Sequence, residues 1–253
     1  MGGAYSENGV KGAGSGKGKA NPRGGGAGSG NSCAGPGKRA KRRCGGRIVI
    51  DAPFIDQREK YPTGCESVTA VMALNYAGVD IEPGEFIENY LEKGSMPHVA
   101  GGAVVGANPR KAFVGSPYSP NDNGCYSPVI KRAAEKVIAD KAAGAYSVAD
   151  AGGLSLGKLC AKYIRKGIPV LLWATMYMRH TFRGESWRDE DDASVRITWR
   201  NNEHCLLLVG YDKKYYYFND PLIGAKTRFT KSRVKRAYRS MFRQALAILP
   251  EAK

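Results

Sequence analysis

The stretch Tyr61-Pro62-Thr63-Gly64-Cys65-Glu66-Ser67 opens the part of the chain that decides the fold. The apolar residues that follow it at helical spacing are Val68, Val71, Met72 and Leu74. Gly78 stands where a helix with this pattern should end. The spacing therefore predicts a helix over about 64–77, with Cys65 in its first turn.

Cys65 has the position of an activated nucleophile. Thr63 and Glu66 have the spacing of a capping box, which fixes a helix start locally. Free backbone N–H groups and the positive end of the helix dipole favour a thiolate at such a start, above all when a protonated histidine is near. The alternative is that Cys65 is a small buried residue, as most free cysteines are.

A second stretch, 203–221, reads EHCLLLVGYDKKYYYFNDP and predicts two strands joined by a tight turn. Side chains alternate along a strand, so the turn length decides which residue shares a face with His204. A three-residue loop places Asp220 there, and a four-residue loop places Asn219. Either side chain can accept from the imidazole N–H and orient the ring, as a catalytic triad requires.

His204 is the best candidate for a base among the three histidines of the chain. His98 lies in a glycine-rich segment, and His180 follows an apolar run in an arginine-rich stretch. Neither has a hairpin with a carboxylate beside it. The alternative is that His204 is a structural histidine at a strand end.

These residues resemble those of the bacteriocin-processing (double-glycine) peptidase-like family, which has a papain-like fold. The resemblance covers about residues 47–253. Beyond the stretches quoted, it includes Gln57, 53–55, 86–91, 123–130, 167–170 and 173–175. It implies that Cys65 is the nucleophile, His204 the general base and acid, and Asp220 the orienting acid. It also implies that the Gln57 side chain and the Cys65 backbone N–H form the oxyanion hole.

The expected fold class is α+β and papain-like, with N-terminal helices and a nucleophile-bearing helix packed on an antiparallel sheet. Further helices are expected at about 84–93, 128–140, 156–166 and 231–242. Strands are expected near 48–50, 168–176, 204–211, 215–219 and 244–249. The segments 98–123 and 179–202 are expected to be long loops that form the walls of a cleft.

Residues 1–46 are expected to be a disordered tail, with one folded domain over 47–253. The tail holds 16 of the 33 glycines and nine Lys or Arg against one acid, Glu7. It cannot bury enough apolar surface to offset its chain entropy. The net charge of +16 and the basic run 38–43 suggest non-specific contact with a polyanion. No aromatic platform accompanies the run, so specific nucleic-acid binding is not expected.

Neither a cofactor nor a metal is expected. No Cys-x-x-Cys or His-x-x-x-His spacing occurs, and the six cysteines do not form a recognisable disulfide framework. Cys125, ahead of an expected helix, is interpreted as a packed residue and not as a second nucleophile. No signal peptide or transmembrane segment is expected, and the compartment stays open.

The function expected is cleavage of peptide or amide bonds by a Cys-His-Asp triad, with a peptide or protein as the substrate. Two alternatives remain. The first is a catalytically inactive peptide-binding domain of the same fold, and the second is a polyanion-binding protein that uses its basic tail.

Overall fold

The main sheet of the protein is built around β11 (Glu203–Tyr211), which carries His204. The computed structural model describes residues 42–44 and 46–251, and these belong to one compact unit. The eight strands of this sheet pair in antiparallel fashion. One edge of β11 pairs with β12 (Tyr215–Asp220), which pairs in turn with β13 (Gly224–Thr230). The other edge pairs with β8 (Val170–Thr175), followed by β14 (Ala245–Pro250) and β7 (Tyr146–Asp150).

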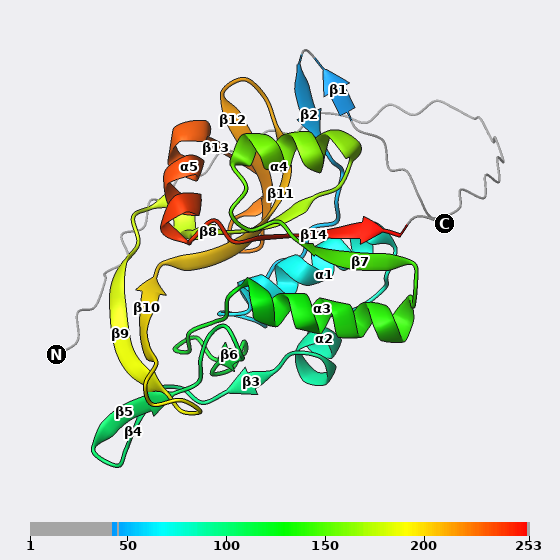
Figure 1. Cartoon of the computed structure of the whole chain (residues 1–253). Helices are drawn as coiled ribbons and strands as arrows, with labels where there is room; N and C mark the ends of the chain where they lie inside the picture. The colour runs from blue at the N-terminus through cyan, green and yellow to red at the C-terminus, as the bar shows by residue number, and fades with distance from the viewer. Residues whose placement is uncertain (1–41, 45, 252–253) are drawn as a thin grey trace, which may run out of the picture. The chain divides into compact units, whose positions relative to one another are not determined.

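Helices cover both faces of this sheet (Figure 1). On one face lie α1 (Cys65–Ala77), α2 (Pro83–Asn89) and α3 (Ser127–Lys141). On the other lie α4 (Leu156–Lys162) and α5 (Lys231–Ser240). Because both faces are covered, β8 and most of β11 are buried and apolar rather than alternating. Short 3-10 turns, η1 (Ile164–Lys166) and η2 (Met176–Met178), flank β8.

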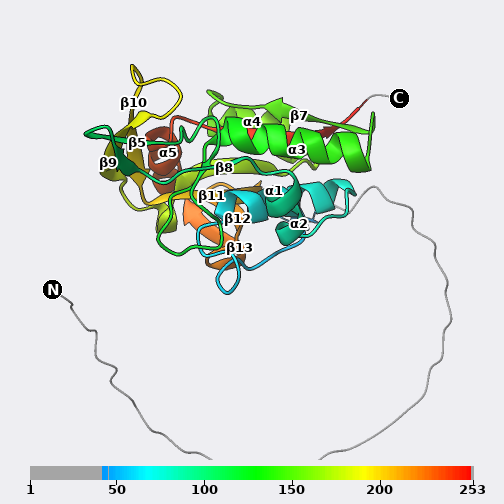
Figure 2. The same cartoon turned by 90° about the horizontal axis from the view of Figure 1, so that it is seen from below.

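Helix α1 is the central helix of the domain and packs directly on β11 (Figure 2). Every residue from Cys65 to Leu74 is buried, so this helix lacks a solvent-facing stripe over most of its length. It ends at Gly78, which has φ 107° and donates its N–H to the carbonyls of Leu74 and Asn75. Glycine suits this left-handed position because it has no Cβ.

The region expected to form long loops instead contributes a second sheet, so that expectation was wrong. Two hairpins, β4 (His98–Ala100) with β5 (Ala103–Gly106) and β9 (Phe182–Asp189) with β10 (Arg196–Asn201), join through parallel pairing of β5 with β9. Trp187, Ile197 and Trp199 are buried in this part of the chain. Their apolar side chains give the hairpins a core. In the sequence these residues stand among arginines and acids, so the apolar pattern was not recognised. A short parallel pair, β3 (Lys93–Gly94) with β6 (Phe113–Val114), lies nearby in the chain.

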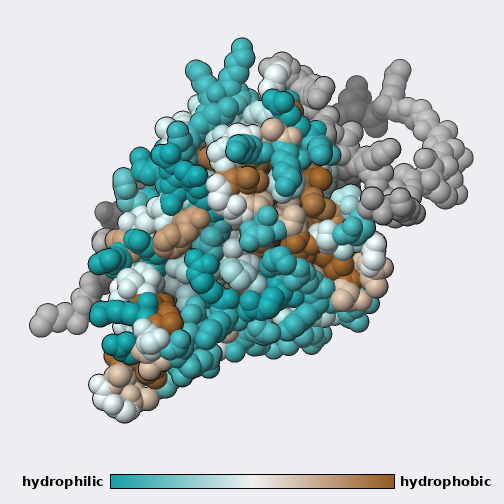
Figure 3. All heavy atoms as spheres, viewed as in Figure 1, coloured by the Kyte–Doolittle hydropathy of each residue, from teal (hydrophilic) through white to brown (hydrophobic). Residues whose placement is uncertain are grey.

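The β4–β5 hairpin presents apolar side chains to solvent at its tip. Val99 and Val104 are exposed there, and Figure 3 shows apolar surface at this end of the view.

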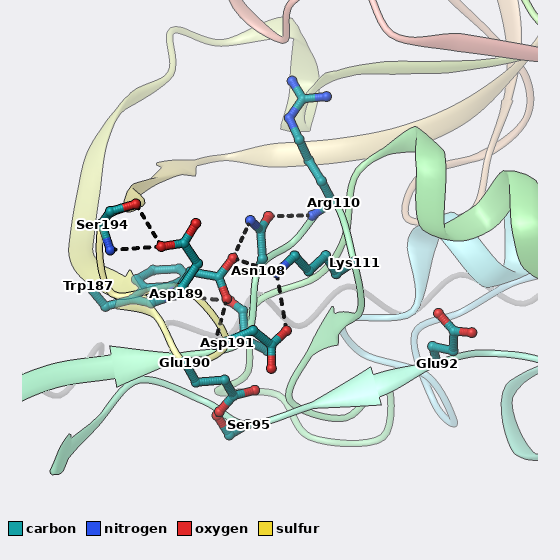
Figure 4. A network of polar contacts seen from close by, with 12 residues as sticks. Glu92, Ser95, Asn108, Arg110, Lys111, Trp187, Asp189, Glu190, Asp191 and Ser194 are labelled. Carbon is teal, nitrogen blue, oxygen red and sulfur yellow. Dashed lines mark hydrogen bonds and ion pairs between the residues drawn. The ribbon is translucent and has the colours of Figure 1, made fainter.

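A separate polar network joins the C-terminal end of β9 to the segment before β6 (Figure 4). In that network Asp189 accepts from Asn108 Nδ2 at 2.9 Å and pairs with Lys111 Nζ at 3.0 Å.

The five helices and five strands expected from the sequence are present, with ends shifted by a few residues. The expected strand near 48–50 is β2 (Arg47–Val49), and the main sheet also contains three strands that were not expected: β1 (Arg42–Cys44), β7 and β13. Strand β1 falls inside the expected tail, so folded structure begins before residue 47. The rest of that tail, apart from Gly46, lies outside the described residues: 1–41 and 45. Across the described chain we find no helix long and apolar enough to cross a membrane.

Candidate active site

Cys65 is the first residue of α1, at the place expected for it. Gly64 precedes the helix in a crowded position, because a Cβ there would lie 2.9 Å from Tyr61 Cβ and 3.2 Å from Pro117 Cβ. Only glycine lets the chain enter the helix this closely. Two loops thus hold the backbone of Cys65 in place, and its side chain is 5% exposed.

The expected capping box is wrong. Gly64 caps the helix, and no side chain bonds the free N–H groups of the cap. Thr63 Oγ1 donates instead to the carbonyls of Ser116 and Ser119. The Glu66 carboxylate turns into the core, where Oε1 accepts from the Cys125 N–H at 2.7 Å. Both side chains found partners more than fifty residues away, which a local motif cannot anticipate.

His204 and Asp220 lie together in the hairpin of β11 and β12. His204 Nε2 lies 2.7 Å from Asp220 Oδ1, and both side chains are almost fully buried. Asp220 Oδ1 also accepts from the Leu222 N–H at 3.0 Å, which fixes the carboxylate. An ionised carboxylate accepts hydrogen bonds only, so the Nε2–H of His204 faces Asp220, and Nδ1 is the ring nitrogen that does not contact it.

A β-bulge decides that Asp220, and not Asn219, shares a face with His204. Near the turn Tyr211 pairs with Tyr216, which is the register of the four-residue loop that favours Asn219. The register then shifts between Gly210 and Leu208, and beyond the shift Leu207 pairs with Asn219. The one-residue shift moves Asp220 to the face of His204. Asn219 points the other way and donates to the carbonyls of Ala52 and Pro53.

Gln57 lies in the loop that leads to Cys65, with its side chain 3% exposed. Its backbone N–H donates to the Pro221 carbonyl at 3.1 Å, next to Asp220. Its amide Nε2 donates to the carbonyls of Pro62 at 2.9 Å and Tyr61 at 3.3 Å. In this conformation Gln57 therefore braces the loop ahead of Cys65, and the longer of the two bonds is the weaker one.

The Cys65 thiol is held by groups other than His204. It donates to Glu66 Oε2 at 3.3 Å, and its sulfur accepts from the Cys205 N–H, also at 3.3 Å. Among the described residues, no hydrogen bond joins Cys65 to His204. Burial, followed by the charges of Glu66 and Glu203, raises the pKa of Cys65 well above its usual range. These effects oppose the lowering that a helix N-terminus alone provides.

Sequence reasoning missed the two glutamates beside the site. Glu66 follows Cys65, and Glu203 precedes His204. Burial raises the pKa of Glu66 to about 7, and burial together with Glu66 raises the pKa of Glu203. The available signal was that Cys65 and His204 each have a glutamate as an immediate neighbour in the sequence.

Cys65, Glu66 and Glu203 could bring three ligand atoms to one metal ion, since these atoms lie within 4.8 Å of one another. A set of one thiolate and two carboxylates without a histidine is unlike the usual zinc sites. The three residues therefore do not define a metal centre.

Unpartnered polar atoms gather at this site. Gln57 Oε1, Glu203 Oε1 and Asp220 Oδ2 are buried and have no hydrogen-bond partner in the described part of the chain. Buried polar atoms are nearly always paired in folded proteins. Orphans of this kind are typical of places where function, rather than stability, selects the residues.

The fold is that of a C39-like peptidase. A crystal structure of a candidate C39-like peptidase from Bacillus anthracis matches with a TM-score of 0.67 at 23% identity, over 81% of this chain and 98% of that one. The chain belongs to the Peptidase_C39 like family, whose model matches residues 49–246. It is also 29% identical, over 207 residues, to the uncharacterized protein YvpB of Bacillus subtilis (strain 168), covering 81% of this chain and 77% of that protein. The family resemblance and the α+β fold expected from the sequence are confirmed.

Proposed function

We propose that the protein is a cysteine peptidase that cleaves peptide or amide bonds in a peptide or protein substrate. The observation that carries the proposal is the His204–Asp220 contact of 2.7 Å, buried at the end of a hairpin that packs on the helix of Cys65. The matching family and fold support the same class of activity.

In this proposal each residue has a separate chemical task. Cys65 attacks the scissile carbonyl, and His204 Nδ1 takes the thiol proton and later gives it to the leaving amine. Asp220 holds the ring so that Nδ1 stays available. The Cys65 backbone N–H and one N–H of Gln57 stabilise the oxyanion, for which Gln57 gives up its 3.3 Å bond to the Tyr61 carbonyl.

One movement is needed before reaction. The thiol hydrogen points at Glu66 Oε2 in this structure, so the Cys65 side chain must turn toward His204. Catalytic hydrogen bonds often tighten only when substrate is bound. The proposed nucleophile is thus in a resting arrangement, and its thiol is protonated.

The test combines chemical labelling with turnover. Cys65 is alkylated with iodoacetamide in the wild type and in His204→Ala, with peptide mapping by mass spectrometry. Hydrolysis of a peptide library is followed in parallel for the wild type and Cys65→Ala. We expect loss of hydrolysis in Cys65→Ala with an unchanged circular dichroism spectrum, and slower labelling in His204→Ala. Undiminished hydrolysis by Cys65→Ala contradicts the proposal.

A second candidate is a peptide-binding domain of the same fold without chemistry. The raised pKa of Cys65, caused first by burial, is the observation that favours it. Peptides bound equally by wild type and Cys65→Ala, with no products from either, would establish this candidate. The polyanion-binding alternative concerns mainly the basic tail, most of which lies outside the described residues. Its test is whether binding to an anionic polymer weakens as salt increases.

A further inference from the structure

Two glutamates flank Cys65 and have no part in the proposed triad. The Cys65 sulfur and one carboxylate oxygen from each of Glu66 and Glu203 lie within 4.8 Å of one another. The backbone of Gly124 is pressed against the same carboxylates. A Cβ on Gly124 would lie 2.4 Å from Glu66 Oε1 and 3.4 Å from Glu203 Oε2. The three acidic groups therefore share one closely packed pocket.

The hydrogen bonds in this pocket give the two glutamates different states. Glu66 accepts from the Cys125 N–H at 2.7 Å and from the Cys65 thiol at 3.3 Å. Glu203 Oε1 has no hydrogen-bond partner, and within the described chain neither carboxylate forms an ion pair with a lysine or arginine. A carboxylate that accepts two hydrogen bonds is the one that ionises first. Of the two glutamates, Glu66 is thus the one that ionises first.

The other titratable groups around the pair keep it close to a single charge. Cys125 and Cys205 are buried, and burial raises the pKa of both thiols well above their usual range. Burial also raises the pKa of Tyr126, near Glu203. His204 lowers the pKa of Glu66, and Arg132 acts on Cys125 from α3. Near neutral pH, Glu66 is therefore the one acid in the pocket that changes its charge.

We propose that Glu66 is a built-in brake on Cys65, which limits the thiolate population above neutral pH. This inference rests on the proposed function for its biological meaning, although the brake itself is a property of the thiol. Glu66 acts through Cys65 and is a positioning residue. Nothing in the triad requires an acid at this position.

The limit on the thiolate population follows from the number of protons that Cys65 and Glu66 hold between them. When Glu66 is ionised, the thiolate can form if the thiol proton moves to Glu66, which leaves the number of bound protons unchanged. Raising the pH further therefore does not raise the thiolate fraction. A second proton must leave before the thiolate fraction can increase, and the repulsion between two neighbouring negative charges at this buried position opposes that loss. Without an acid at position 66, the thiolate fraction keeps rising about tenfold per pH unit up to the thiol pKa.

The experiment is the pH dependence of Cys65 alkylation by iodoacetamide between pH 5 and 9 in the wild type, Glu66→Gln and Glu203→Gln. Peptide mapping separates Cys65 from the other cysteines. The amide oxygen introduced by Glu66→Gln can still accept from the Cys125 N–H, so the fold is expected to hold, and a circular dichroism spectrum at each pH checks it. Glu203→Gln is the matched control, because it changes the other carboxylate beside Cys65 and leaves Glu66 in place.

In the wild type we expect the rate to rise with pH and level off near pH 7, where Glu66 ionises. In Glu66→Gln it continues to rise and exceeds the wild-type rate about tenfold at pH 8. Glu203→Gln keeps the levelling. Identical profiles in wild type and Glu66→Gln overturn the brake.

A second measurement covers the case in which Glu66→Gln does not fold. In wild-type protein with ¹³C-labelled glutamate, one side-chain carboxyl signal should titrate near pH 7 and shift its midpoint in Cys65→Ala. Titration of every glutamate below pH 5 overturns the proposal. The brake and the proposed function fail separately. A shifted profile in Glu66→Gln without any turnover leaves the brake standing alone, and turnover with an unshifted profile leaves only the peptidase.

Discussion

Two regions of the molecule bury carboxylates in opposite ways. At the second sheet, Asp189 is 1% exposed and is surrounded by donors: Asn108 Nδ2, Lys111 Nζ and the Asp191 N–H (Figure 4). Burial acts to raise its pKa, but the hydrogen bonds from Asn108 and Lys111 outweigh it, and the pKa is lowered. At α1, Glu66 is 0% exposed, and its donors are backbone N–H groups and the Cys65 thiol with no lysine or arginine among them, so burial prevails and its pKa rises to about 7.

The difference separates a structural acid from an acid at a candidate site. A carboxylate with a full set of donors stabilises the folded protein and can be ionised at little cost. A buried carboxylate without a paired cation stores unfavourable energy whenever it is charged, and such groups persist mainly where chemistry needs them. By this criterion Asp189 stabilises the second sheet, whereas Glu66 and Glu203 are part of the candidate site around Cys65.

The largest expected effect concerns a third buried acid, Asp220, whose partner is a proposed catalytic residue. Asp220→Ala removes the acceptor that orients His204, and loss of a triad acid typically lowers kcat on the order of 10⁴-fold. Steady-state peptide hydrolysis measures this. Asp189→Asn is the matched control, and we expect it to leave kcat unchanged. Equal loss of activity in both variants would erase the distinction between the two regions.

The next effect is on stability, through Glu66. Its pKa is about 7 in the folded protein and 4.5 in the unfolded chain, so the folded state binds more protons between these values. The contribution of Glu66 to the free energy of unfolding is therefore fully present below pH 4.5. It falls by on the order of 3 kcal/mol as the pH rises through about 7. Glu66→Gln lacks this loss. Urea unfolding at pH 5 and pH 8 should show the variant gaining stability relative to the wild type as pH rises, and a constant difference contradicts the raised pKa of Glu66.

The elements around Cys65 and His204 were predictable because their signals are local. Apolar spacing from Val68 to Leu74 predicts α1, and the apolar runs on either side of the polar turn at 212–214 predict the hairpin. The glutamates were not predictable in this way. Glu66 was assigned to a capping box, but its carboxylate bonds the Cys125 N–H, fifty-nine residues away. A contact that long depends on tertiary packing, and short-range spacing carries no information about it.

The register of Asp220 shows a second limit. The turn pairs Tyr211 with Tyr216, and only the bulge beyond Gly210 restores the face that His204 needs. The bulge coincides with a tight approach of β2, since a Cβ on Gly210 would lie 2.3 Å from the Ile48 carbonyl oxygen. Glycine at this position therefore had a meaning, but it became readable only once β2 was placed. The second sheet escaped prediction similarly, because β5 and β9 pair across about eighty residues of chain.

Gln57 belongs to the same comparison, because its Oε1 is one of the buried atoms without a hydrogen-bond partner among the described residues. If its N–H stabilises the oxyanion, Gln57→Ala lowers kcat about 100-fold or more and leaves KM nearly unchanged. If it only braces the loop through Pro62, the loss falls on stability and KM instead. Kinetics and thermal unfolding of the same variant distinguish the two, and an unchanged kcat removes Gln57 from the proposed oxyanion hole.

The smallest expected effect is on stability and concerns Asp189, the buried acid that is surrounded by donors. Asp189→Asn keeps the volume and one acceptor but loses the charge that Asn108 and Lys111 address, which should cost about 1–2 kcal/mol at pH 7. Because the pKa of Asp189 is lowered, this stability is present above the unfolded value of 3.8 and is lost as pH falls through the folded value. The slope is opposite to that of Glu66. Asp191→Asn is the control: Asp191 is 69% exposed and pairs with the same lysine, so its loss should cost less than about 1 kcal/mol. Equal costs for the two variants in urea unfolding would mean that burial of Asp189 adds nothing to its hydrogen bonds. The contrast with Glu66 would then rest on the donors alone.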